Sequence, residues 1–461
     1  MLNRIFKYAV CNQTNVTKAS SCSSYTHKNL VYQFMANRIL FFILVLCFST
    51  TESQNSIENK YSGVFRHGNF STDIIIDIHQ KNDLNQVFFS SPEQNAYNIP
   101  ARDVAIESDS IAFILQSDFF RYEFKGEFQG DSLNMNLSIE KNVYPFVLIK
   151  SSAFQEEQIS SRDIRFRSDN LLLYGTLYLP QKPNGKAIYL VTSSGDQDRS
   201  ASRAEAQFLA LQGYITLHAD KRGTGLSDGN WQEADIPELC MDDIQAITYL
   251  SETNSLDYSN IGIKGSSQGA SKVPYILSKM PELGFGIVVS CPASTLLDSD
   301  LNYWKNRTRK ELSEDELNQA AEIQRSVFLF IAGEITKEEL GNQIERVRNE
   351  TWMSTVWVPE LDSVRTDQKL NYTPMPFFEQ LKKPILVIQG SSDEIIPSHS
   401  LKTIRGLTEN NNPGNRYVEL KNADHSMMLQ AESDFPYWPA LHPSYRSEML
   451  KWLKQLELSG N

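Results

Sequence analysis

The stretch "IGIKGSSQGASKVPYIL" (residues 261–277) joins a short apolar run to a helix-like segment through a turn bounded by two glycines. Gly265 to Gly269 read G-x-S-x-G, with Ser267 at the centre. A serine on such a strand-to-helix turn projects its hydroxyl above the edge of a sheet, and the small flanking residues let strand and helix approach. The stretch therefore predicts a nucleophilic serine, against the alternative of a purely structural turn.

Short, nearly continuous apolar runs recur on both sides of this turn, and helix-like segments separate them. Strands that are buried on both faces of a parallel sheet have this composition. Alternating strands and helices predict an α/β fold with right-handed crossovers, here a hydrolase-like domain over residues 160–461. The expected strands are 187–193, 214–220, 260–265, 285–290 and 384–390, and the expected helices are 201–212, 235–250 and 268–280.

A helical cap is expected at about residues 293–378, between two of these strands. Ser313 with Glu316 and Thr336 with Glu339 have the spacing of capping boxes, which start helices. The stretch "ETWMSTVW" (350–357) either lines an apolar acyl pocket or forms the core of the cap.

The region 55–155 is expected to be a small antiparallel β domain, a barrel or a sandwich. In "FFRYEFKGEF" (119–128) and "DSLNMNLSIE" (131–140), apolar residues alternate with polar ones, which is typical of half-buried strands. A Gly-Asp pair between the two stretches favours a tight turn.

Residues 1–54 are an upstream extension that ends in a signal-peptide-like segment, 35–54. Arg38 precedes an unbroken apolar run over 39–48, which is short for a membrane span. We expect an exported protein, periplasmic or secreted, with no stable membrane span after removal of the signal. The alternatives are a retained membrane anchor, a lipid attached at Cys47, and organelle import directed by the basic residues that precede Met35.

Composition narrows the class of partner. The chain has 461 residues, 41% hydrophobic and 22% charged, as in ordinary globular proteins. Its net charge of −12, with no basic patch, argues against nucleic acid as a partner. Past the signal-like segment, Cys240 and Cys291 lack metal-site spacing, and two buried thiols are favoured over a disulfide.

A nucleophilic serine needs a base, and the base needs a carboxylate that orients it. "PILVIQGSSDEIIP" (384–397) places Asp393 just after a strand, and "NADHSMM" (422–428) places His425 after the next one. The chain order Ser267, Asp393, His425 is the order of an α/β hydrolase, with each residue at the carboxyl edge of the sheet. These three residues are the predicted catalytic triad.

Other residues could serve as the acid or as the base. The rival acids are Glu394, Asp298 and Asp300. The remaining histidines of this region are interpreted as structural: His218 inside a strand, His399 at a helix start and His442 before a proline.

The oxyanion formed by an attacked carbonyl needs two backbone N–H donors. One is expected from Gln268, the residue after the nucleophile. The other is expected from the loop "TSSGDQDRS" (192–200), where Ser194 is favoured slightly over Gly195. This chemistry requires neither a metal nor an organic cofactor.

In "HADKRGTGLSDG" (218–229), Asp220 and Arg222 are expected to form a structural ion pair or turn hydrogen bonds.

Together the motifs "GSSQGA", "SGDQDRS", "DKRGTGLSDG", "GSSDEIIP" and "NADHS" resemble the α/β-hydrolase superfamily. The similarity is to a branch of exported bacterial esterases and acyl thioesterase-like hydrolases near the serine aminopeptidases and prolyl oligopeptidase-like enzymes. It spans about 163–458, and the β-rich stretch before it is similar to a small N-terminal domain of some members. The resemblance implies Ser267 as nucleophile, Asp393 as acid and His425 as base.

Two positions depart from the pattern of that branch. Ser266 stands where histidine is usual, and Ser193-Ser194-Gly195 stands where Gly-Ser-Gly is usual. Both changes keep the backbone N–H groups and are expected to alter loop shape and rate.

The predicted function is a serine hydrolase that cleaves carboxylic esters through an acyl-enzyme, with a small-molecule ester or acyl substrate. A peptidase or an acyl thioesterase could use the same triad, because the pocket and cap select the leaving group. A remote alternative is a non-catalytic binding protein of the hydrolase fold.

Overall fold

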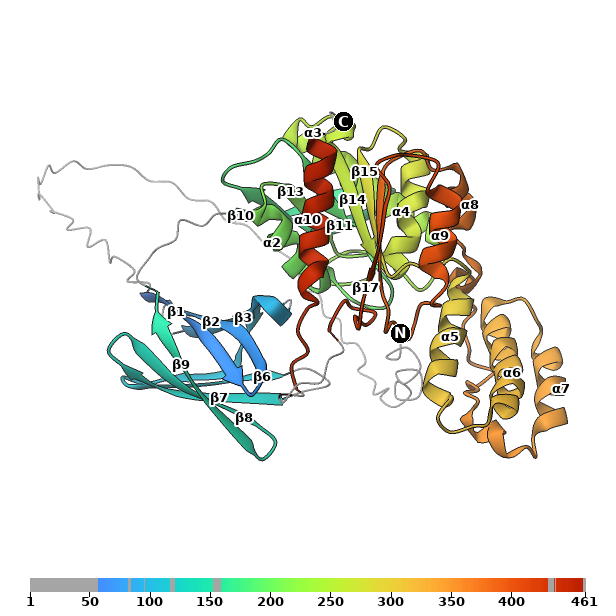
Figure 1. The fold of residues 1–461 in the computed structure, drawn as a ribbon, viewed down its shortest axis with the longest axis horizontal. Helices are drawn as coiled ribbons and strands as arrows, with labels where there is room; N and C mark the ends of the chain where they lie inside the picture. The colour runs from blue at the N-terminus through green and yellow to red at the C-terminus, as the bar shows by residue number, and fades with distance from the viewer. Residues whose placement is uncertain are drawn as a thin grey trace, which may run out of the picture.

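The part of the chain that the structure describes forms two β sheets, with helices around the second (Figure 1). The computed structural model describes residues 57–81, 84–94, 96–116, 121–151, 159–429, 435 and 437–458. The upstream extension and the signal-like segment 35–54 lie outside these residues. Within the described part of the chain, no helix combines the length and hydropathy that crossing a bilayer requires.

The N-terminal sheet, sheet A, has nine antiparallel strands in the order β4-β3-β2-β1-β9-β8-β7-β6-β5. Leu133, Met135 and Leu137 point into its core and alternate with more exposed neighbours, so the predicted antiparallel sheet is confirmed. Its strands are β1 (Ile57–His67), β2 (Phe70–Lys81), β3 (Leu84–Ser91), β4 (Ala96–Pro100), β5 (Arg102–Ile106), β6 (Ser110–Gln116), β7 (Arg121–Gln129), β8 (Ser132–Ile139) and β9 (Asn142–Lys150).

The second sheet, sheet B, has eight strands in the order β10-β11-β13-β12-β14-β15-β16-β17. β10 and β11 pair antiparallel, and the strands from β13 to β17 are parallel. Its central strands are apolar and fully buried, as the sequence predicts. The strands are β10 (Ile159–Ser168), β11 (Leu171–Pro180), β12 (Ala187–Leu190), β13 (Ile215–Ala219), β14 (Ile261–Ser266), β15 (Phe285–Val289), β16 (Ile385–Gly390) and β17 (Arg416–Leu420).

Helices cover both faces of sheet B. α2 (Arg203–Leu211) and α10 (Pro443–Leu458) bury apolar residues against one face, and α10 crosses in front of the sheet in Figure 1. The other face is covered by α3 (Ile236–Asn254), α4 (Gln268–Lys279), α8 (Met375–Gln380) and α9 (Ser400–Thr408). The helix expected at 201–212 begins as a 3₁₀ turn, Arg199–Ser202, and the one expected at 235–250 runs to Asn254.

Three further helices lie between β15 and β16 in the chain and are grouped together in Figure 1. They are α5 (Leu296–Thr308), α6 (Glu314–Ala332) and α7 (Lys337–Val347). Both predicted capping boxes are present, at Ser313 and Thr336. Trp352 is buried in the core that the three helices share, so it is a core residue of this helical insertion.

Candidate active site

The turn that carries Ser267 is sharp and strained. Ser267 has φ 56° and ψ −125° between β14 and α4, a conformation that residues with a side chain rarely adopt. Its N–H donates to Val289 O at 3.0 Å, which fixes the turn to the end of β15. A Cβ on Gly265 would lie 2.3 Å from Gly269 O, so the close approach of strand and helix depends on a glycine there.

Asp393 and His425 form a hydrogen-bonded pair in which the carboxylate is buried. His425 Nδ1 lies 3.1 Å and 3.0 Å from the two carboxylate oxygens of Asp393, whose side chain is 0% exposed against 20% for His425. The same carboxylate accepts the N–H groups of Ile395 and Ile396, at 2.9 Å and 3.0 Å. A carboxylate can only accept, so Nδ1 donates, and in the neutral form of the imidazole Nε2 carries the lone pair that a base needs.

Backbone contacts bring this pair and Ser267 to the same sheet edge. Ser290 Oγ donates to His425 O at 2.9 Å, and Ser290 directly follows the residue that accepts from Ser267 N–H. A Cβ on Gly390 would lie 2.2 Å from Ala423 O, so the Asp393 and His425 loops are also in contact. The Ser267 turn, the His425 loop and the Asp393 loop therefore meet at the carboxyl ends of β14 to β17.

Loop 192–200 follows β12 and packs against the Ser267 turn. Ser193 Oγ donates to Ser266 O at 2.9 Å and accepts from Gly269 N–H at 3.4 Å. Gln268 is buried at the first position of α4. The two predicted oxyanion donors, Gln268 and Ser194, therefore lie on segments that touch each other.

The rival acids have other surroundings. Asp298 caps α5: burial opposes its ionisation, but hydrogen bonds from Thr295 and Arg325 hold the pKa of its carboxyl below the usual value. Glu394 is exposed, and its backbone carbonyl accepts from two asparagines of α5. His218 is buried inside β13, as predicted, and His442 Nδ1 accepts the Ser444 N–H at the start of α10. His399 directly precedes α9.

The ion pair expected between Asp220 and Arg222 is wrong. Asp220 pairs instead with Arg199 and accepts the Leu226 N–H at 3.0 Å, while Arg222 pairs with Asp242 at 2.6 Å. The Asp220 carboxylate is buried and faces Arg199, whereas the Arg222 guanidinium extends to Asp242 on α3. Turn hydrogen bonds, the other expectation for Asp220, are present.

A buried network that no sequence motif predicted lies behind loop 192–200. Lys272 and Asp243, both 0% exposed, form an ion pair at 2.6 Å. Lys272 Nζ donates to Thr192 Oγ1 at 2.7 Å, and Asp243 accepts the Thr192 N–H at 3.2 Å and the Tyr189 hydroxyl at 2.7 Å. The one available signal was a lysine and an aspartate inside otherwise apolar helix faces. This network fixes the start of the loop.

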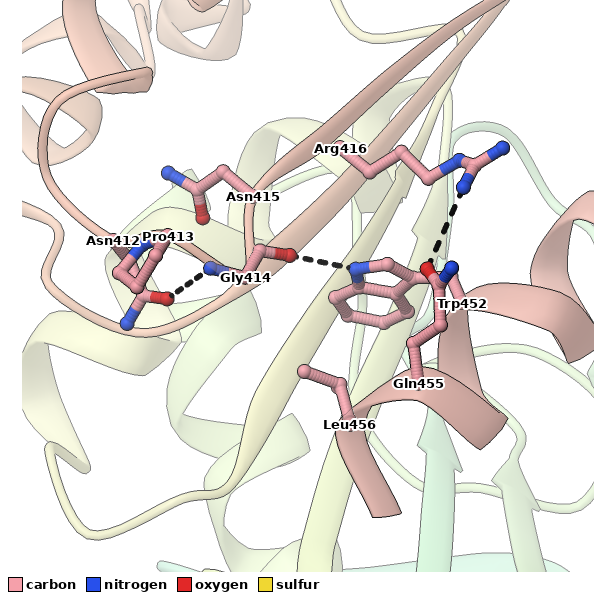
Figure 2. Close-up of a pocket in the computed structure, with 8 residues that line it drawn as sticks. All are labelled: Asn412, Pro413, Gly414, Asn415, Arg416, Trp452, Gln455 and Leu456. Atoms are coloured by element: carbon pink, nitrogen blue, oxygen red, sulfur yellow. Dashed lines mark hydrogen bonds between the residues drawn. The ribbon is translucent and has the colours of Figure 1, made fainter. Parts of the chain in front are cut away.

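Cys240 and Cys291 are free, buried thiols, as favoured from the sequence. Among the described residues, no group of three or more His, Cys, Asp and Glu side chains has the geometry of a metal site. A cavity of about 350 Å³ lies at the amino end of β17, where Trp452 Nε1 donates to Gly414 O at 2.8 Å (Figure 2). That end is opposite to the edge that carries Ser267.

The sequence matches the profile of a known protein family. The family profile described as X-Pro dipeptidyl-peptidase (S15 family) matches residues 144–427. No curated protein matches the chain.

Three solved structures are similar over much of their length. An esterase from Pyrococcus furiosus has 17% identity and a TM-score of 0.43, covering 66% of this chain and 94% of its own. An α/β hydrolase from a Penicillium species has 15% identity and a TM-score of 0.42, covering 65% and 98%. A proline iminopeptidase from Mycobacterium smegmatis has 14% identity and a TM-score of 0.43, covering 66% and 100%.

Proposed function

The chain belongs to the X-Pro dipeptidyl-peptidase (S15) family of the α/β-hydrolase clan, and from this premise we propose that it cleaves carboxylic esters by nucleophilic catalysis at Ser267. Family membership makes the protein a hydrolase, whereas the ester substrate and the residue roles are our proposal. One observation carries it: a buried carboxylate, Asp393, on Nδ1 of His425, at the sheet edge that also holds a strained serine.

In the first half of the proposed reaction, Ser267 Oγ bonds to the acyl carbon of the ester. His425 Nε2 takes the hydroxyl proton, and the carbonyl electron pair moves onto the oxygen, which becomes the oxyanion. The bond to the leaving oxygen then breaks, and the proton on Nε2 passes to it. The alcohol leaves and an acyl-Ser267 ester remains, while Asp393 stabilises the imidazolium throughout.

In the second half, water attacks the same carbonyl. His425 Nε2 accepts a proton from the water, and a second oxyanion forms. When it collapses, the acyl–Oγ bond breaks, the proton returns to Ser267 Oγ and the carboxylic acid leaves. The N–H groups of Gln268 and Ser194 stabilise both oxyanions, and one such donor contributes a factor of roughly 10²–10³ to kcat.

We further propose that α5 to α7 act as a cap that borders the acyl pocket. Support comes from the contacts between α5 and the loop after Asp393. Asn302 Nδ2 donates to Glu394 O at 3.2 Å and to Ile395 O at 3.1 Å, and Asn306 Nδ2 donates to Glu394 O at 2.8 Å. These amides join the helical insertion to the loop of the proposed acid.

The second candidate is amide cleavage, and the family match favours it. A peptidase would use the same residues, but the leaving amine needs protonation by His425 more than an alkoxide does. We favour ester cleavage because an alkoxide can leave with less help from a proton donor than an amine needs. The two candidates differ in the leaving group and in the pocket that holds the acyl part, which the triad does not decide.

The test is turnover by the purified protein of p-nitrophenyl esters from acetate to decanoate, beside an X-Pro p-nitroanilide. We expect ester hydrolysis that Ser267→Ala lowers by roughly 10⁶. Ser278→Ala, which removes a hydroxyl from the far end of the same helix α4, serves as the matched control and should keep full activity. Turnover of the anilide alone would favour the peptidase, and a Ser267→Ala variant with full activity would refute the nucleophile.

A further inference from the structure

Lys221 is a buried cation aimed at loop 192–200. It lies two residues after β13, its residue is 2% exposed, and its Nζ is 4.5 Å from the centroid of the Trp231 ring. Nζ donates to Ser193 O at 2.8 Å and also to Gly195 O. The positive φ of Gly195, 76°, accompanies a turn that directs both carbonyls to one ammonium group.

The direction of these carbonyls fixes the direction of two N–H groups. In a planar trans peptide, the C=O of one residue and the N–H of the next point in opposite directions. The described part of the chain contains no cis peptide bond. The N–H groups of Ser194 and Asp196 therefore point away from Lys221.

The strand order shows which segment lies on the side of the loop that faces away from Lys221. Sheet B runs β13-β12-β14, so loop 192–200, which follows β12, stands between Lys221 after β13 and Ser267 after β14. The contact of Ser193 Oγ with Ser266 O marks the β14 side of the loop. An N–H that points away from Lys221 therefore points toward the Ser267 turn.

We propose that Lys221 is a positioning residue of the oxyanion hole, holding Ser193 O so that the Ser194 N–H faces the reacting carbonyl beside the N–H of Gln268. The inference rests on the proposed function and deepens it by naming the residue that orients the second donor, the Ser194 N–H. The charge behind the loop also polarises the peptide group between Ser193 and Ser194, since hydrogen bonds in a chain strengthen one another at low dielectric. Lys221 itself touches no substrate atom in this arrangement.

The test is Lys221→Met, which keeps the unbranched chain as far as the position of Cε and removes the ammonium group with its donors. We expect kcat for a p-nitrophenyl ester to fall by roughly 10²–10³ while KM stays within about twofold, as for loss of one oxyanion donor. Affinity for a trifluoromethyl ketone, which forms a tetrahedral oxyanion on the serine, should fall by a similar factor. Lys221→Arg, which can still donate to both carbonyls, should recover part of kcat.

Lys369→Met is the matched control. Lys369 is also buried, its Nζ is 5.9 Å from the centroid of the same Trp231 ring, and it donates to Ala234 O at 3.1 Å on another loop. It should leave kcat and ketone affinity unchanged. Expressing kcat per site labelled by a fluorophosphonate removes any contribution from misfolded protein.

Three results are distinguishable. If Lys221→Met matches the wild type in kcat and in ketone affinity, or if Lys369→Met loses as much, the assignment of Lys221 is overturned. If the wild type itself shows no turnover that depends on Ser267, the proposed function fails, and the inference falls with it. A loss confined to kcat and ketone affinity in Lys221→Met supports the assignment.

Discussion

His218 shows what burial does to a single titratable group next to the site. Its ring is enclosed in β13, 5.6 Å from the Tyr178 ring by centroid distance, and Nδ1 lies 3.1 Å from Ser202 Oγ. Burial, with nearby Arg199 and Arg203, lowers the pKa of His218 from 6.5 to about 4, although a backbone hydrogen bond opposes the shift. The imidazole is therefore neutral at physiological pH and is a structural group.

This pKa predicts a loss of stability in mild acid. Because the folded-state pKa lies below the unfolded one, the unfolded chain takes up the proton first as pH falls. The contribution of His218 is complete above pH 6.5 and declines toward pH 4, by up to on the order of 3 kcal/mol. In His218→Gln this part of the decline should vanish, as measured by urea unfolding at pH 7 and pH 4.5. Identical declines in both proteins would contradict the prediction.

At the scale of the elements, the junction of β14 and α4 leaves no room for a side chain at Gly265. A Cβ on Gly265 would meet three backbone atoms, Gly269 O at 2.3 Å, Gly269 C at 2.4 Å and Ala270 N at 2.7 Å. Backbone cannot move aside as a flexible side chain can, so the strand and the helix would have to separate. The close approach at Gly265 is therefore one of the contacts that hold Ser267 in place.

Gly265→Ala should therefore abolish ester turnover and lower the free energy of unfolding by about 1–3 kcal/mol or more. Gly406→Ala is the control at a different helix: it lies in the interior of α9, exposed, with no atom near the added Cβ. That change should stabilise the protein by about 0.4–1 kcal/mol and leave turnover intact. Thermal unfolding and ester assays on both variants check the pair, and an active Gly265→Ala protein would disprove the account.

At the scale of the whole molecule, the chain after His425 links sheet B to sheet A. Leu429 N–H donates to Ala440 O at 2.7 Å, so the chain doubles back on itself just past His425, the proposed base. Further along, Phe435 and Trp438 are buried in the core of sheet A, with ring centroids 4.9 Å and 5.5 Å from that of Phe65. We infer that sheet A anchors the segment that carries the base.

Trp438→Ala removes one of these anchors. It should destabilise sheet A by about 3–5 kcal/mol and also lower kcat, because the His425 loop loses its attachment. Phe113→Ala provides the comparison: Phe113 is buried in the same core and stacks on Phe124 at 4.8 Å. It should cost similar stability but leave kcat per fluorophosphonate-labelled site unchanged, at a temperature where both variants stay folded. Equal kcat in the two variants would show that sheet A does not support the base.

The local features of this protein follow from the sequence alone. The buried strands of sheet B, the alternation in β8, the capping boxes of α6 and α7 and the G-x-S-x-G turn all depend on residues within a few positions of one another. Turn geometry, helix capping and the alternation of buried residues depend on near neighbours in the chain, so the pattern of residue types predicts them. The chain order of Ser267, Asp393 and His425 is likewise readable, because a parallel sheet brings the ends of successive strands to one edge.

Tertiary structure decided which distant groups are partners. Asp220 pairs with Arg199 and not with Arg222, and Lys221, between them in the chain, turns to Ser193. Trp438 enters a core built from strands β1 to β9, the last of which ends at Lys150, far earlier in the chain. A charged side chain can form hydrogen bonds with many possible partners, and an aromatic side chain can be buried against many possible neighbours. Only the packed fold brings one of these partners within reach.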